Sequence, residues 1–152
     1  HLVAGIVIRE GKLLLVENIK YPQLRLEYFG GKVDPGETNE DAIKREGREE
    51  IGQEPRITGT VEDFLTESIE GQFIVHNFLC GIDGEPMQGL EPKKIGVIKW
   101  YSYADLERIN SEQPGLLAPN VAAMLPLLKV AYKSFFVSRI CLSASLTAVW
   151  CC

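Results

Sequence analysis

The stretch that decides the fold spans residues 30–53 and reads GGKVDPGETNEDAIKREGREEIGQ. Thr38 stands three positions before Asp41, which is the spacing of a helix capping box. The residues that follow are rich in Glu, Lys, Arg and Ala and contain no proline until a glycine ends the run. The stretch therefore predicts a helix from Asn39 to about Ile51, entered through a glycine-rich turn.

The predicted helix has one acidic face and one apolar face. At about 100° per residue, Glu46, Glu49 and Glu50 fall on one side, and Ile43 and Ile51 fall on the other. Like charges at this spacing repel each other by roughly 0.2–0.5 kcal/mol per pair, and a hard divalent cation offsets that repulsion. A solvated face of Glu–Lys and Glu–Arg pairs is the alternative. The double glycine ahead of the helix favours the interpretation as a cation site, because backbone without Cβ atoms can approach a ligand closely.

The same residues resemble the Nudix box, G-x5-E-x7-R-E-U-x-E-E-x-G-U, in which U is aliphatic. The chain matches the glycines and the charged positions of that pattern, which fall at Gly31, Glu37, Arg45, Glu46, Glu49, Glu50 and Gly52. Two aliphatic positions depart from it and hold Gly47 and Gln53. Gly47 weakens the helix by up to about 1 kcal/mol relative to Ala, and we expect it to remove a core contact.

The resemblance implies an α+β fold, an α/β/α sandwich around a central mixed, largely antiparallel sheet. It also implies hydrolysis of a nucleoside diphosphate linked to another group, with Mg²⁺ or Mn²⁺ as the cofactor. The implied metal ligands are Glu46, Glu49, Glu50 and the backbone carbonyl of Gly30. Glu37 and Arg45 would form the ion pair that braces the glycine loop against the helix.

The family often carries one more acid just before the later tryptophan, and this chain departs from that pattern. Lys93, Lys94 and Ile95 stand at the positions concerned, and the nearest acid is Glu91, ahead of Trp100. Glu91 is therefore our candidate for an extra ligand or a general base. The alternative is a surface charge on a loop.

Two segments outside the box resemble the MutT-type enzymes and the animal oxidised-purine nucleoside triphosphatases. They are Phe29-Gly30-Gly31-Lys32-Val33 and Leu117-Ala118-Pro119-Asn120 with the leucines after it. The resemblance implies that Glu27 and Asn120 read the base, and Gly31 and Lys32 complete the predicted substrate-binding set. An amide both donates and accepts hydrogen bonds, which suits a purine edge. The alternatives are a helix N-cap before Val121 for Asn120 and an exposed strand residue for Glu27.

Apolar runs and turn residues predict the remaining elements. We expect a hairpin of Leu2–Ile8 with Leu13–Glu17 and a brief strand at Leu26–Phe29. Further strands are expected at Ile57–Leu65, Gln72–Cys80 and Ile95–Tyr101, and helices at Tyr103–Ile109 and Val121–Phe136, the latter bent or restarted at Pro126. Residues 1–136 would form one Nudix hydrolase domain, and residues 137–152 a tail of unknown role.

The amino-acid composition excludes some classes of binding partner for this chain. The 152 residues carry 21 acidic and 16 basic side chains, a net charge of −5, which argues against binding a nucleic-acid polymer. The four cysteines lack zinc-site spacing, and we expect thiols in a cytoplasmic protein. The apolar tail is too short and too polar to predict a membrane anchor, and a monomer or homodimer is expected.

The predicted function is Mg²⁺-dependent hydrolysis of a nucleoside triphosphate to a nucleoside monophosphate and pyrophosphate. An oxidised purine such as 8-oxo-dGTP is the expected substrate. An ADP-ribose or nucleotide-sugar pyrophosphatase is one alternative. A catalytically silent Nudix module that binds a nucleotide is another.

Overall fold

The computed structural model describes residues 1–68 and 71–130. Its strands are β1 (Leu2–Ile6), β2 (Ile8–Arg9), β3 (Lys12–Asn18), β4 (Arg25–Glu27), β5 (Phe29–Lys32), β6 (Arg56–Ser68), β7 (Gly71–Gly81) and β8 (Ile95–Ser102). Its helices are α1 (Asn39–Ile51), α2 (Tyr103–Glu112) and a helix over residues 119–130. The predicted tail, residues 137–152, lies outside the described residues.

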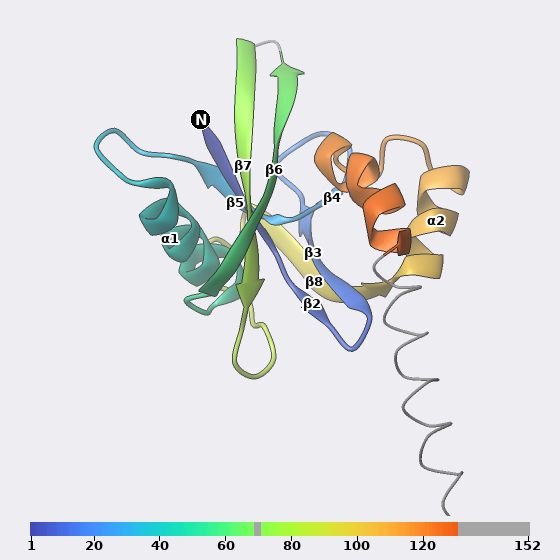
Figure 1. Ribbon diagram of the computed structural model, residues 1–152, viewed down its shortest axis with the longest axis horizontal. Coiled ribbons are helices and arrows are strands. Elements are labelled where there is room, and N and C mark those ends of the chain that lie inside the picture. Colours follow the sequence, from blue (N-terminus) through green and yellow to red (C-terminus); the bar gives the residue numbers. More distant parts are fainter. Residues whose placement is uncertain (69–70, 131–152) are drawn as a thin grey trace, which may run out of the picture.

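The strands form two sheets between helices. One sheet has the order β5-β1-β7-β6, and the other joins β2, β3 and β4, with β8 also paired to β3. Strands β1 and β7 run parallel, whereas the other paired strands of the described residues run antiparallel. Figure 1 shows α1 on one side of the strands, and α2 with the 119–130 helix on the other. The predicted sandwich with a mixed, largely antiparallel sheet is confirmed.

A core lies on each side of the strands, and β3 separates the two. Leu13 and Leu15 of β3 pack with residues of α2 and the 119–130 helix. Leu14 and Val16 point the opposite way and pack with Ala42, Ile43 and Ile51 of α1. Alternate residues of a strand face opposite sides of a sheet, so one short apolar run supplies both cores.

The predicted hairpin of Leu2–Ile8 with Leu13–Glu17 is wrong in its first strand. Only β2 pairs back onto β3, through a tight turn in which Glu10 and Gly11 have φ of 49° and 71°. Strand β1 instead lies between β5 and β7. A continuous apolar run is typical of a strand buried on both faces, but it does not identify the strand's partners. The brief strand expected at Leu26–Phe29 divides between β4 and β5.

The remaining elements follow the expectations closely. Helix α1 has the predicted bounds, and β6, β7 and β8 contain the predicted strands. Helix α2 extends a few residues beyond its predicted end. The last helix begins at residue 119 and continues through Pro126 within the described residues. None of the helices in residues 1–68 and 71–130 is long and apolar enough to cross a membrane.

Candidate metal and nucleotide site

Helix α1 begins and ends where its sequence requires, and this fixes the direction of its acidic face. The Thr38 hydroxyl accepts a hydrogen bond from Asp41 N–H at 3.1 Å. Gly52 takes the left-handed conformation at φ 67°, and its N–H bonds the carbonyl of Gly47. Between these caps, Glu46 and Glu50 point inward and are only 4% and 1% exposed. Two carboxylates are thus buried one helical turn apart.

The glycine loop lies directly on these carboxylates. Gly30 N–H donates to Glu50 Oε2 at 3.0 Å, and its φ of 151° suits glycine. A Cβ atom on Gly31 would stand 2.2 Å from Glu46 Oε1. Strand β5 therefore approaches α1 so closely that a side chain at Gly31 would displace the Glu46 carboxylate. The metal-ligand role of the Gly30 carbonyl stays a prediction.

The long loop between β7 and β8 brings Glu91 to the same place. Met87 N–H donates to the Ile51 carbonyl at 3.0 Å, and Glu91 N–H donates to the Glu49 carbonyl at 3.1 Å. These carbonyls belong to the last turn of α1, which has no intrahelical donors for them. Gly89 allows the approach, because a Cβ atom there would stand 2.1 Å from the Glu49 carbonyl oxygen.

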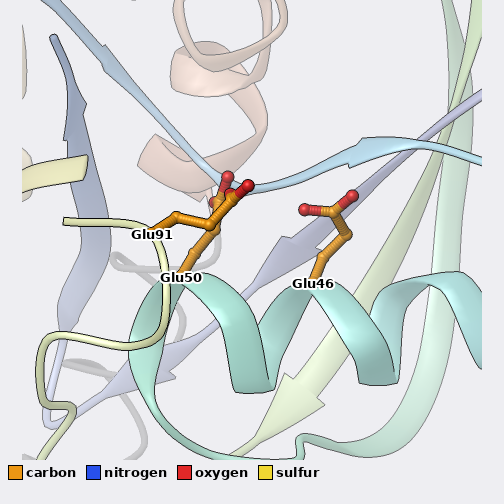
Figure 2. A group of neighbouring side chains, drawn as sticks. All are labelled: Glu46, Glu50 and Glu91. Atoms are coloured by element: carbon orange, nitrogen blue, oxygen red, sulfur yellow. The ribbon is translucent and has the colours of Figure 1, made fainter. Parts of the chain in front are cut away.

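Glu46, Glu50 and Glu91 form what we call the carboxylate cluster. One oxygen from each lies within 4.8 Å of the others. Figure 2 shows two of these side chains rising from α1 and the third reaching them from the loop. Glu46 Oε2, Glu50 Oε1 and Glu91 Oε2 are all buried, and among the described residues the Lys94 ammonium is their one polar neighbour. Converging carboxylate oxygens are the donor set that Mg²⁺ or Mn²⁺ prefers, so the residues fit that cofactor.

Burial dominates the electrostatics of the cluster. Desolvation raises the pKa of Glu50 to about 8, even though the nearby Lys94 ammonium lowers it. Desolvation also raises the pKa of Glu46, against the opposing effects of Lys94 and Arg45. Burial therefore opposes the ionised form of both carboxyl groups, whereas the Lys94 ammonium favours it and a bound divalent cation would favour it further.

Arg45 joins the glycine loop to the helix, as the resemblance implies. Its guanidinium binds both oxygens of Glu37 at 3.0 Å and the carbonyl of Lys32 at 2.9 Å. The hydrogen bonds from Arg45 lower the pKa of Glu37. The same guanidinium also holds Glu46 Oε1 at 2.8 Å and Glu49 Oε2 at 3.0 Å. Of the predicted acidic ligands, Glu49 alone lies outside the carboxylate cluster, because its carboxylate faces Arg45.

Lys94 is the residue at this site to which the sequence reasoning gave no role. Its Nζ lies 2.7 Å from Glu50 Oε1, 3.0 Å from Glu91 Oε2 and 3.6 Å from Glu46 Oε2. Partial burial lowers the pKa of Lys94, but Glu50 and the other carboxylates outweigh burial and raise it overall. The signal for this placement was the position of Lys94 itself, where the family often carries an acid.

The two predicted base-reading residues lie on neighbouring segments. Leu26 of β4 exchanges backbone hydrogen bonds with residues 116 and 118, at 2.8 and 2.9 Å, which sets the start of the last helix beside β4. Glu27 accepts a hydrogen bond from Asn18 Nδ2 and is only partly exposed, so the exposed alternative for it is wrong. Burial raises the pKa of Glu27. Asn120 Oδ1 accepts from Val121 N–H at 3.1 Å, but the helix already includes residue 119, so Asn120 is not its N-cap.

The two departures from the box have structural explanations. A Cβ atom on Gly47 would stand 2.4 Å from Pro55 Cδ, so the space of an aliphatic side chain is filled by a residue that follows the helix. The expected loss of a core contact is therefore wrong. Gln53 lies at the surface, and its Nε2 donates to the Glu85 carbonyl at 2.6 Å.

Lys32 belongs to the predicted substrate-binding set. Its ammonium lies 5.8 Å from the centre of the Phe73 ring.

Comparison with known proteins defines the class. A family model described as "NUDIX domain" matches residues 1–127, so the chain belongs to the Nudix family. Over 76 residues it is 43% identical to the CTP pyrophosphohydrolase of Escherichia coli K12, a match that covers 49% of this chain and 56% of that protein. Over 55 residues it is 46% identical to the 8-oxo-dGTP diphosphatase of Haemophilus influenzae, covering 34% of this chain and 40% of that protein.

The matched stretches thus span about half the length of these two relatives or less. A solved structure agrees over a longer range. The E. coli ORF135 protein superposes with a TM-score of 0.64 at 28% identity, covering 91% of each chain. The likeness to the ORF135 protein therefore extends over the whole fold.

Proposed function

We propose that the chain is a divalent-metal-dependent pyrophosphohydrolase that acts on nucleoside triphosphates. Water would break the bridge between the α and β phosphates and leave a nucleoside monophosphate and pyrophosphate. The observation that carries the proposal is the carboxylate cluster, in which three buried carboxylate oxygens converge beside a glycine loop. When bound there, Mg²⁺ or Mn²⁺ would supply Lewis-acid stabilisation of the phosphate charge and lower the pKa of an attacking water.

Individual residues of the chain would bind the metal, accept a proton and position the glycine loop. Glu46, Glu50 and the Gly30 carbonyl would hold the metal, and Glu49 would join them by turning away from Arg45. Glu91 belongs to the cluster by position, and it would serve as an extra ligand or take the proton of the attacking water. Arg45 and Glu37 would fix the glycine loop against α1, so that the ligands keep their spacing while substrate binds.

Nucleoside triphosphates are favoured as the substrate class, with an oxidised purine such as 8-oxo-dGTP proposed as the preferred member. Support comes from the two relatives, which are a CTP pyrophosphohydrolase and an 8-oxo-dGTP diphosphatase by name. Glu27, with its raised pKa, supplies a carboxyl group that donates a hydrogen bond when protonated and accepts one when ionised. Asn120, from the neighbouring segment, supplies an amide, and Gly31 and Lys32 would contact the phosphates.

The test is a pyrophosphate-release assay over a panel of nucleotides with Mg²⁺ and then Mn²⁺. The panel contains 8-oxo-dGTP, dGTP, CTP and, with a phosphate readout after phosphatase treatment, ADP-ribose. Glu50→Gln is the inactive variant and Glu40→Gln, on the exposed first turn of α1, is its matched control. We expect turnover of triphosphates by the native chain and by Glu40→Gln, and its loss in Glu50→Gln.

Each outcome bears on a separate part of the proposal. No turnover of any nucleotide with either metal would overturn the hydrolase and leave a binding module. A preference for ADP-ribose would overturn the triphosphate assignment. A preference for CTP over 8-oxo-dGTP would keep the class and remove the oxidised purine.

A further inference from the structure

The backbone of Lys94 is held firmly while its side chain has room to move. Lys94 N–H donates to the Glu91 carbonyl at 3.0 Å, and the Lys94 carbonyl accepts from Ile19 N–H at 2.9 Å. The side chain is about a quarter exposed and borders an open hollow that Lys20 and residues 90–93 also line. A lysine stem has several rotatable bonds, so its ammonium can leave one position without any change in the fold.

The ammonium stands in the middle of the carboxylate cluster. Its partners are Glu50 Oε1, Glu91 Oε2 and Glu46 Oε2, at 2.7, 3.0 and 3.6 Å. These same three oxygens are buried and have no other hydrogen-bond partner among the described residues. A positive charge thus already lies where the oxygens converge. A divalent ion bound to them would share that space with a like charge only a few ångströms away, which is strongly unfavourable in a buried site.

We propose that Lys94 is a resident cation that competes with the divalent metal for the carboxylate cluster. In the metal-free protein its ammonium offsets the repulsion among the three carboxylates, and metal binding displaces it toward the hollow. The metal affinity of the native chain is therefore lower than its ligand set alone would give. The inference rests on the proposed function only for the expectation that a divalent ion binds here.

The first test measures metal binding rather than turnover. Mn²⁺ is titrated into native protein, Lys94→Met and Lys93→Met, and free Mn²⁺ is followed by electron paramagnetic resonance. Lys93→Met removes the same charge from the neighbouring, exposed position. We expect Lys94→Met to bind Mn²⁺ at least about tenfold more tightly than the native chain, since the competing charge is gone. Lys93→Met should stay within about twofold, because an exposed charge is well screened.

A second measurement uses the native protein and so does not depend on the variant folding. The amines are labelled briefly with acetic anhydride, with and without Mg²⁺, and the modification of each lysine is measured by mass spectrometry. Displacement by the metal should raise the labelling of Lys94 at least about threefold while Lys93 changes little, because an amine that leaves three carboxylates becomes accessible.

Equal Mn²⁺ affinity of Lys94→Met and Lys93→Met would overturn the proposal, as would weaker binding by Lys94→Met. Unchanged labelling of Lys94 at saturating Mg²⁺ would also overturn it, since the ammonium would then be a permanent structural partner. Neither measurement involves a nucleotide. Failure of the hydrolase proposal, seen as absent turnover, is therefore distinguishable from failure of this one.

Discussion

Gly31 and the Glu46 carboxylate occupy adjoining space between β5 and α1, with no room between them for a side chain at residue 31. A methyl group on Gly31 would lie 2.2 Å from Glu46 Oε1, so either the carboxylate or the strand must shift. Because Glu46 belongs to the carboxylate cluster, we expect Gly31→Ala to weaken Mn²⁺ binding by about tenfold and to lower the free energy of unfolding by about 1–3 kcal/mol.

Gly59→Ala in β6 is the matched control for that prediction. A Cβ atom there meets Leu79 Cδ1 at 3.7 Å, which is an ordinary contact. Mn²⁺ titration and urea denaturation of both variants give the comparison. If Gly31→Ala bound Mn²⁺ as tightly as Gly59→Ala, the close approach of β5 to α1 would not control the ligand geometry.

Glu50 makes the stability of the metal-free protein depend on pH. Its pKa is raised by burial from an ordinary value of 4.5 to about 8. Between these values the folded chain holds a proton that the unfolded chain has lost, so stability falls as the pH rises from about 4.5 through about 8. We expect the free energy of unfolding in EDTA to fall between about pH 5 and about pH 8, and to fall less in Glu50→Gln.

Urea denaturation of both proteins at a series of pH values measures this difference. The glutamine cannot ionise, and a slope that remains in the variant comes from other groups, among them Glu46 and Glu27, whose pKa values are also raised by burial. Parallel pH profiles for the two proteins would show that Glu50 does not titrate differently in the folded and unfolded chains.

At the scale of elements, the bounds of helices and strands could be predicted from adjacent residues, but the contacts between distant parts of the chain could not. The cap at Thr38 and the glycine at 52 are written into adjacent residues, so the bounds of α1 could be predicted. The partners of β1 are strands farther along the chain, and the apolar run at residues 2–8 does not indicate which strands these are. Gly47 was misjudged for the same reason, because Pro55 fills its space from beyond the helix.

In the candidate site too, some contacts could be predicted from the sequence and others could not. The pairing of Arg45 with Glu37 is implied by the resemblance to the Nudix box, and the structure contains it. The meeting of Lys94 with three carboxylates depends on how the β7–β8 loop binds the end of α1. No spacing in the sequence encodes that contact. That contact places the Lys94 ammonium at a position where the resemblance led us to look for an acidic side chain.

The β7–β8 loop is positioned by its backbone, which gives a prediction about Gly89. A side chain there would collide with the Glu49 carbonyl oxygen, at 2.1 Å, and lift the loop from α1. The hydrogen bonds that bring Glu91 to the cluster would then be lost. We expect Gly89→Ala to weaken Mn²⁺ binding about as much as Glu91→Gln does, by roughly tenfold, since each removes one carboxylate from the set.

Leu90→Ala is the control for the loop, because the Leu90 side chain is 80% exposed and adjoins Gly89. Isothermal titration with Mn²⁺ on the three variants tests the prediction. Native-like binding by Gly89→Ala would mean that Glu91 reaches the cluster without the backbone contacts, and the loop would have no positioning role.

At the scale of the whole molecule, the two cores are joined by strands that contribute side chains to both, β3 among them, and this predicts how the protein unfolds. Leu14 of β3 packs with α1 and Leu15 packs with α2 and the last helix, and both are about 1% exposed. Truncating a buried leucine to alanine costs roughly 2–5 kcal/mol. Because β3 cannot lose its place in one core and keep it in the other, we expect Leu14→Ala and Leu15→Ala to destabilise the domain as one cooperative unit.

Urea unfolding followed by far-ultraviolet circular dichroism and by near-ultraviolet aromatic signals measures this cooperativity. The two probes should give coincident transitions in the native chain and in both variants, with midpoints lowered by comparable amounts. Separate transitions in Leu15→Ala, with the α1 side retained, would mean that the site and its core fold independently of the opposite face. In that case the carboxylate cluster, which is built on α1, would keep its Mn²⁺ affinity when the second core is damaged. Loss of Mn²⁺ affinity in step with the loss of folded protein is the result that a shared strand requires.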